Sequence, residues 1–186
     1  MSGRHPRTRA RPRVLVTAAS RHGSTHEIAD ALARRLQEAA GDRGLTAAAL
    51  HAENRPDPAS FDAVVLGSAV YHGSWLEPAR DLAHRHAAVL RARPLWLFSS
   101  GPIGEPPYPP DEPYDTATLT GLLGPRGHRV FPGRLEPSRL SAPERAVVTA
   151  MRAPVGDFRD RDAVRTWAAE IAMALAAVLP TPEAPH

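Results

Sequence analysis

The sequence predicts an α/β domain with a doubly wound sheet of five parallel strands and helices on both faces. Three runs, residues 13–19, 62–70 and 95–100, are almost continuously apolar, which is typical of strands buried on both faces. Segments with helical spacing of apolar residues alternate with these runs, which indicates a parallel sheet covered by crossover helices. The 186 residues include no cysteine. A single domain of this size buries enough surface to fold without a disulfide.

The first helix is expected at residues 24–40, directly after the strand at 13–19. Ser24 and Glu27 have the S-x-x-E spacing of a capping box, which marks a helix start. Gly41 and Gly44 are expected to end the helix. Its apolar positions recur every four residues: Ile28, Leu32 and Leu36.

An edge strand is expected at residues 45–50, and the two prolines within 54–60 indicate a loop. That loop stands where a crossover helix would join two neighbouring strands. A second helix is expected at residues 76–90, with Pro78 tolerated in its first turn.

The C-terminal half begins with a loop at 101–113, because this stretch holds six prolines and two glycines. A short helix is expected at 116–123, a strand at 128–135 and an inserted helix at 141–152. Residues 160–179 form the strongest helical pattern. Its apolar stripe is Val164, Trp167, Ile171, Leu175 and Val178.

The chain is expected to consist of a basic arm at residues 1–12, a domain at residues 13–179 and a short tail at residues 180–186. Residues 1–13 hold five arginines and no acid, and the rest has 18 basic against 20 acidic residues, a net charge of −2. We expect a disordered arm and tail, no nucleic-acid binding by the domain, and a cytoplasmic protein without a membrane span. A second interpretation of the arm is peripheral contact with anionic lipid or with a partner.

Several chemistries are excluded by the residues present. Without cysteine there is no thiol catalysis or iron–sulfur cluster, and no G-x-S-x-G elbow or His-Glu-x-x-His motif occurs. His84 and His86, two positions apart on a helix, face different directions, so no metal site is predicted. No catalytic residue is assigned; Tyr71 and His72 are the only acid–base candidates.

Residues 20–25 lie between a strand and a helix start, where backbone N–H groups favour an anion. Ser20, Ser24 and Thr25 add hydroxyl donors, and Gly23 allows close approach of the backbone. The segment is neither G-x-G-x-x-G nor a P-loop, so a single phosphate monoester is favoured. The alternative is a capped helix that follows an ordinary glycine turn.

Two further strand ends are expected at the same edge of the sheet, where ligands bind in such folds. In residues 67–73, Tyr71 or His72 is placed to contact a flat ring. Residues 99–104 offer amides and carbonyls to its polar side. The alternatives are a Tyr71 packed in the core, a solvated His72 and an ordinary strand-to-loop turn.

Four segments resemble the flavodoxin-domain family that includes menaquinone-dependent protoporphyrinogen IX dehydrogenase. They are RHGSTHEIADALA, GSAVYHGSWLEPARDLAHRH, LFSSGP and GDFRDRDAVRTWAAEIA, spread between residues 13 and 172. The resemblance implies a flavodoxin-like fold. It also implies that residues 136–155 correspond to the helical insertion of that family.

The resemblance implies non-covalent FMN as the cofactor. The phosphate contacts implied are Ser20, Arg21, His22, Gly23, Ser24 and Thr25. The residues implied beside the flavin ring are Ser68, Ala69, Val70, Tyr71, His72, Gly73, Ser99, Ser100 and Gly101. His22 stands where flavodoxins usually carry a threonine, and the proline-rich loop leaves the substrate undefined.

The function implied is an FMN-dependent oxidoreductase that passes electrons between a small organic substrate and a quinone. Two alternatives remain: a non-catalytic electron carrier, and a flavodoxin-shaped binding module without cofactor. The fold also makes a homodimer a reasonable expectation.

Overall fold

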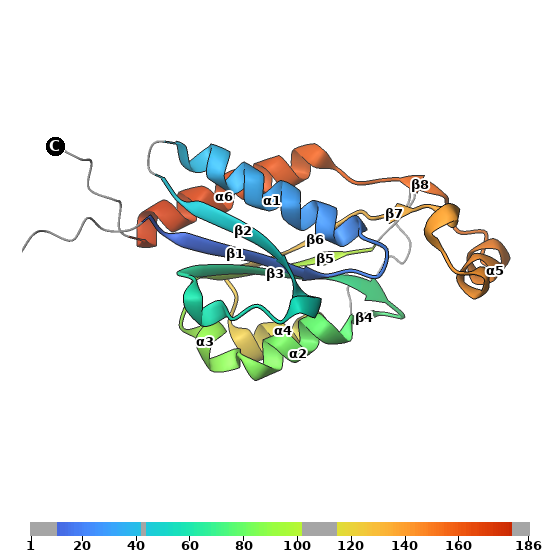
Figure 1. The fold of residues 1–186 in the computed structure, drawn as a ribbon, viewed down its shortest axis with the longest axis horizontal. Helices are drawn as coiled ribbons and strands as arrows, with labels where there is room; N and C mark the ends of the chain where they lie inside the picture. Colours follow the sequence, from blue (N-terminus) through green and yellow to red (C-terminus); the bar gives the residue numbers. More distant parts are fainter. Residues whose placement is uncertain (1–10, 42–43, 102–114, 180–186) are drawn as a thin grey trace, which may run out of the picture.

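The computed structural model describes residues 11–41, 44–101 and 115–179. Its five parallel strands are β1 (Arg13–Ala19), β2 (Thr46–His51), β3 (Ala63–Tyr71), β5 (Leu95–Ser100) and β6 (Gly127–Phe131), in the order β2-β1-β3-β5-β6 (Figure 1). The strand order therefore reverses at β1, whose neighbours on the two sides are β2 and β3. The predicted α/β class, with a parallel sheet covered by helices, is confirmed, but the sheet has six strands because the two-residue strand β4 (Ser74–Trp75) pairs antiparallel with β3.

Helices cover both faces of the sheet (Figure 1). One face carries α1 (Ser24–Ala40) and α6 (Arg161–Val178), and the other carries α2 (Glu77–Arg85), α3 (Ala87–Arg91) and α4 (Asp115–Leu123). Strand residues alternate between the two cores, so that Val14 and Val16 pack toward α1 and α6 while Leu15 packs toward α2. This double burial explains why the strands are continuous apolar runs.

Three aromatic rings fill the core beneath α6. Phe98, Phe131 and Trp167 meet edge to face, with ring centroids 5.5–6.3 Å apart. Gly67 on β3 makes room for them, since a Cβ atom there would lie 2.2 Å from the ring of Phe98. The glycine is required by packing, because it has no positive φ.

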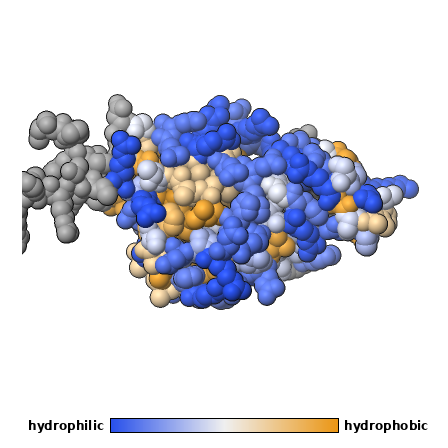
Figure 2. Space-filling view, in the orientation of Figure 1, coloured by the Kyte–Doolittle hydropathy of each residue, from blue (hydrophilic) through white to orange (hydrophobic). Residues whose placement is uncertain are grey.

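β2 is an edge strand with little cover. Its small residues, Ala47, Ala48 and Ala49, are partly exposed, and Leu50 is 39% exposed. Figure 2 shows the corresponding apolar area over β2, within a mostly hydrophilic face.

The predicted turn at residues 71–74 is a β-hairpin. Tyr71 pairs with Ser74, and Val70 pairs with Trp75 of the two-residue strand β4 (Ser74–Trp75). His72 and Gly73 have φ of 50° and 76°, the signs that a type I′ turn requires. The hairpin extends β3 beyond its neighbours at the edge where ligands are expected.

Two expected elements are divided. The prediction of one continuous helix at 76–90 is wrong. The backbone leaves the helical region at His86 (φ −109°), which separates α2 from α3. The strand expected at 128–135 ends at Phe131, since Pro132 lacks an N–H group and the chain leaves the sheet. It continues as β7 (Arg134–Leu135), which pairs antiparallel with β8 (Gly156–Asp157).

The segment between β7 and β8 carries η4 (Pro137–Arg139) and the helix α5 (Ala142–Ala150). In Figure 1 α5 projects beyond the sheet, at the opposite end of the molecule from the C-terminal end of α6. The capping box expected at Ser24 is wrong, because Gly23 is the N-cap of α1 and no side chain of that cap bonds the helix. A capping box instead starts α5, between Ser141 and Glu144.

Some expectations fall outside the described residues: those for residues 1–10, for the proline-rich stretch after Gly101 and for 180–186. Within the described ranges, no helix combines the length and the apolar character needed to cross a membrane.

Candidate functional site

A cavity of about 140 Å³ opens at the carboxyl ends of β1, β3 and β5. It brings together many residues that the sequence singled out from three separate segments. These are Ser20, His22, Ser24, Thr25, Ala69, Val70, Tyr71, Ser100 and Gly101. The cavity therefore lies at the sheet edge where doubly wound proteins bind ligands.

The first wall is the loop of residues 20–25, which we call the 20–25 loop. Ser20 Oγ accepts hydrogen bonds from the backbone N–H groups of Gly23, at 3.0 Å, and Thr25, at 3.3 Å. Gly23 has a φ of 86°, a conformation that side chains other than glycine rarely adopt. Because Ser20 Oγ accepts two hydrogen bonds, its own proton remains available for donation.

Ser24 carries the clearest sign of a missing anionic partner. Its Oγ is buried and has no hydrogen-bond partner within the described residues, and Ser24 is one of the residues that line the cavity. Buried hydroxyls are normally bonded. The start of α1 adds backbone N–H groups and the positive end of the helix dipole. The residues present fit an oxyanion such as a phosphate.

Arginines on the segment after β6 add positive charge. Arg139 Nη1 donates to the carbonyl of His22 at 3.4 Å, and Arg134 lines the same cavity with its side chain only 9% exposed. Arg134 is also held by Glu27, at 2.8 Å, and by Glu136, at 3.5 Å. The cavity thus has cationic groups that are already positioned by carboxylates.

Helix α5 contacts the 20–25 loop through Glu144. Its Oε1 lies 3.2 Å from His22 Nε2 and 3.4 Å from Arg21 Nη1. Hydrogen bonds from Ser141, above all from its backbone N–H, lower the pKa of Glu144 to about 2. The carboxylate is therefore ionised at neutral pH, forms an ion pair with Arg21 and contacts the imidazole of His22.

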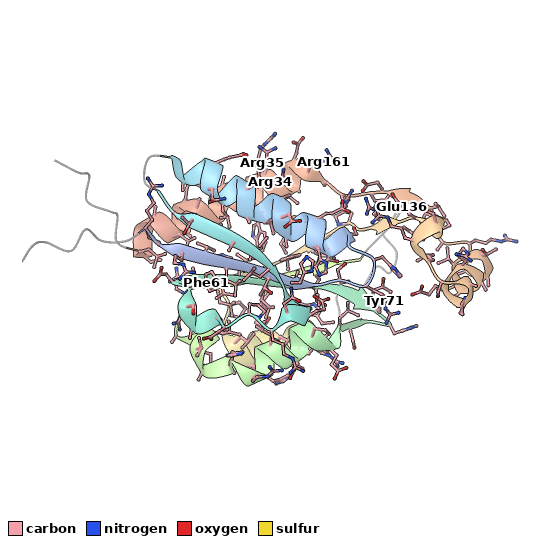
Figure 3. All side chains as sticks on the ribbon, viewed as in Figure 1. Arg34, Arg35, Phe61, Tyr71, Glu136 and Arg161 are labelled. Atoms are coloured by element: carbon pink, nitrogen blue, oxygen red, sulfur yellow. The ribbon has the colours of Figure 1, made fainter. Side chains whose placement is uncertain are left out.

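Tyr71 lies at the cavity rim. The guanidinium of Arg21 sits over its ring, 4.3 Å from the centroid, and the ring of His22 approaches it edge on. Burial raises the pKa of the Tyr71 hydroxyl above its ordinary value. Tyr71 is thus a protonated phenol, able to donate a hydrogen bond. In Figure 3, Tyr71 and Glu136 lie near the same end of the molecule.

Two serines expected beside the ring are instead buried in structural hydrogen bonds. Ser68 Oγ donates to the carbonyl of Ala69, at 2.8 Å, and accepts from the N–H of Leu76, at 2.9 Å. Ser99 Oγ accepts from Trp75 Nε1 at 2.8 Å. Neither lines the cavity; among the expected residues the same holds for Arg21, Gly23, His72 and Gly73.

The sequence did not indicate the second wall of the cavity. It is formed by Gly133, Arg134, Leu135, Glu136, Arg139 and Leu140. A Cβ atom on Gly133 would lie 3.5 Å from the Cα of Gly101, so this wall packs directly on the end of β5. Two features of the sequence could have indicated this wall: the Pro132–Gly133 break and the two arginines that follow it, Arg134 and Arg139.

Comparisons with known proteins agree with this architecture. The model of the family described as "Flavodoxin domain" matches residues 15–162. A flavodoxin from the domain Archaea has a TM-score of 0.56 at 13% identity, over 88% of this chain and 99% of its own. Oxidised Flavodoxin 1 from Bacillus cereus has a TM-score of 0.57 at 14% identity, over 90% and 99%.

A rubredoxin oxygen:oxidoreductase from Desulfovibrio gigas has a TM-score of 0.56 at 18% identity, over 90% of this chain. This chain spans only 37% of that protein. No curated protein matches the sequence. At these identities the structural likenesses show the fold alone.

Proposed function

Because this chain belongs to the flavodoxin domain family, whose model matches residues 15–162, we propose that it binds FMN and acts as an FMN-dependent oxidoreductase. The observation that carries the proposal is the buried, unpartnered hydroxyl of Ser24, a residue that lines the cavity at the strand ends. A phosphate monoester supplies the acceptor that this hydroxyl lacks.

The phosphate end of FMN is assigned to the 20–25 loop. Ser20 and Ser24 donate from their hydroxyls, and the start of α1 donates from its backbone. Arg139 is held by Glu136 at 2.6 Å and lies near this loop, since its Nη1 would be 3.8 Å from a Cβ on Gly23, so it would add a charge-assisted hydrogen bond to a phosphate there. Such charge-assisted hydrogen bonds are shorter and stronger than neutral ones.

The flavin ring is assigned to the rim and not to the interior. The cavity of about 140 Å³ is smaller than the roughly 300–1,000 Å³ of sites that enclose a whole ligand. Ala69, Val70 and Gly101 form a floor of small side chains, which permits close approach of a flat molecule. Leu135 and Leu140 add apolar side chains to the cavity lining.

When bound, FMN supplies the redox chemistry, and the protein sets its position and potential. The cavity offers no carboxylate without a cationic or hydrogen-bonding partner among the described residues, and Tyr71 stays protonated. These side chains therefore bind, orient and exclude water. Tyr71, which stays protonated, is a hydrogen-bond donor at the rim, and the imidazole of His22 lines the same cavity.

The proposed reaction passes electrons between a small organic substrate and a quinone. The support is the resemblance of the sequence segments together with the apolar side chains of Leu135 and Leu140, which suit an aromatic or quinoid molecule. The net charge of −2 on residues 14–186 gives little attraction for a basic redox partner, which disfavours a pure electron carrier.

The test is to purify the full chain, record its visible spectrum and extract the flavin for identification. Reduced protein is then mixed with a soluble quinone. Bound FMN with repeated turnover supports the proposal. Bound FMN that exchanges electrons only with a protein partner supports the carrier, and a colourless protein that does not take up FMN contradicts both.

A further inference from the structure

Two histidines and a glutamate converge outside the cavity, behind the 20–25 loop. His26, His51 and Glu53 each offer one ligand atom, and these atoms lie within 4.8 Å of one another. We propose that they form a binding site for a divalent transition metal, with Zn²⁺ as the representative ion. The site is separate from the FMN cavity, because none of the three residues lines it.

The fold brings these residues together from three elements. His26 lies in the first turn of α1, His51 is the last residue of β2, and Glu53 lies in the short helix η2 (Ala52–Asn54). Parallel pairing of β1 with β2 places His51 opposite Ala18, beside the strand end from which α1 departs. Because His26 is far in sequence from His51 and Glu53, no short sequence motif indicated this cluster.

The spacing suits a shared ion. His26 Nε2 lies 3.2 Å from Glu53 Oε2, as expected for neighbouring ligands that each sit about 2.0–2.2 Å from zinc. The rings of His26 and His51 stack 3.6 Å apart at an interplanar angle of 9°. Parallel rings do not aim at one point, so the exposed His51 must rotate to complete the site.

The glutamate is already oriented by a hydrogen bond. Its Oε1 accepts the backbone N–H of Ser20 at 3.0 Å, which leaves Oε2 directed toward His26. Metal-ligating groups are commonly fixed by such outer contacts. Here the outer contact is with Ser20 of the 20–25 loop, so an ion at this site would stabilise the position of that loop through Glu53.

The donor set determines the class of metal. Two imidazoles and one carboxylate favour Zn²⁺, Cu²⁺, Ni²⁺ or Co²⁺, whereas Mg²⁺ and Ca²⁺ prefer oxygen ligands alone. Three protein ligands leave at least one coordination position for water.

The test is equilibrium dialysis of the untagged, FMN-loaded full chain against zinc chloride, with magnesium chloride as the comparison. We expect one zinc per chain and no magnesium at the same concentrations. His51→Ala and Glu53→Gln should each weaken zinc binding at least about tenfold, and His84→Ala, an exposed histidine on α2, should leave it unchanged.

His51→Ala is the decisive variant, because the side chain is exposed and its loss should preserve the fold and the FMN content. Unfolding temperature and flavin content are measured for each variant. The proposal is overturned if zinc binding is unchanged in both His51→Ala and Glu53→Gln. It is also overturned if the folded, flavin-loaded wild-type chain shows no saturable zinc binding. A wild-type chain that binds one zinc but takes up no FMN would support the metal site and contradict the FMN assignment alone.

Discussion

Glu144 and His22, 122 residues apart in sequence, are joined by a contact of 3.2 Å between Oε1 and Nε2. Glu144 belongs to the capping box of α5, and His22 belongs to the 20–25 loop. No side chain of α5 itself is buried, so the helix packs little apolar surface against the domain. The position of α5 therefore depends on charged and polar contacts to a loop that we assign to the cofactor.

Replacing Glu144 by Gln should loosen α5 while leaving the domain folded. The change removes the charge that pairs with Arg21 and His22. Amide hydrogen exchange within α5 should rise several-fold, with the unfolding midpoint nearly unchanged because α5 buries no side chain against the domain. Glu170→Gln, at an exposed ion pair with Arg129, is the control and should not affect α5.

The ionisation of Glu144 predicts a pH dependence of α5. The pKa of Glu144 is lowered to about 2 in the folded protein, chiefly by the Ser141 backbone N–H. Its contribution is therefore complete above the ordinary carboxyl range and is lost as the pH falls through about 4 toward 2. Hydrogen exchange of α5 in wild type should approach that of Glu144→Gln over this interval, and a difference that stays constant down to pH 2 would be inconsistent with it.

Gly67→Ala should destabilise the domain although it adds one methyl group. That group would lie 2.2 Å from the Phe98 ring, which is itself fixed against Phe131 and Trp167. We expect a loss of about 1–3 kcal/mol in the free energy of unfolding, measured by urea titration. Gly121→Ala on α4 meets nothing within 4 Å and should instead stabilise by about 0.5–1 kcal/mol.

Gly23→Val tests whether the backbone of the 20–25 loop must be left-handed. A Cβ on Gly23 has space, with Arg139 the nearest group at 3.8 Å, so the penalty comes from the φ of 86°. We expect a cost of about 1–2 kcal/mol for the native loop geometry and FMN content well below that of wild type. Full retention of FMN in this variant would show that the loop conformation is irrelevant to binding.

The sequence predicted the parts of the fold that depend on local pattern. The buried strands β1, β3 and β5 followed from continuous apolar runs, and α6 followed from the spacing of its apolar residues. The capping box predicted at Ser24 was wrong. The S-x-x-E motif is also compatible with glycine as the N-cap, here Gly23, whose backbone N–H donates to the hydroxyl of Ser20.

The candidate site was predicted only where it follows strand ends. The 20–25 loop, Ala69 to Tyr71 and Ser100 to Gly101 meet in one cavity as expected. The wall from Gly133 to Leu140 was missed, because its position depends on ion pairs such as Arg134 with Glu27, across 107 residues. The grouping of His51 with His26 was also missed, because it depends on the parallel pairing of β2 with β1, which local sequence patterns do not specify.

The most direct measurement compares FMN with riboflavin, which lacks the phosphate, by titrating the flavin-free protein and following flavin fluorescence. If the 20–25 loop holds the phosphate, FMN should bind at least about a hundredfold more tightly, about 2.7 kcal/mol. Ser24→Ala should shrink that ratio at least about tenfold, while Ser60→Ala, an exposed serine on η3 (Pro58–Ser60), should preserve it. Equal affinity for the two flavins, or a ratio unchanged by Ser24→Ala, would contradict the assignment.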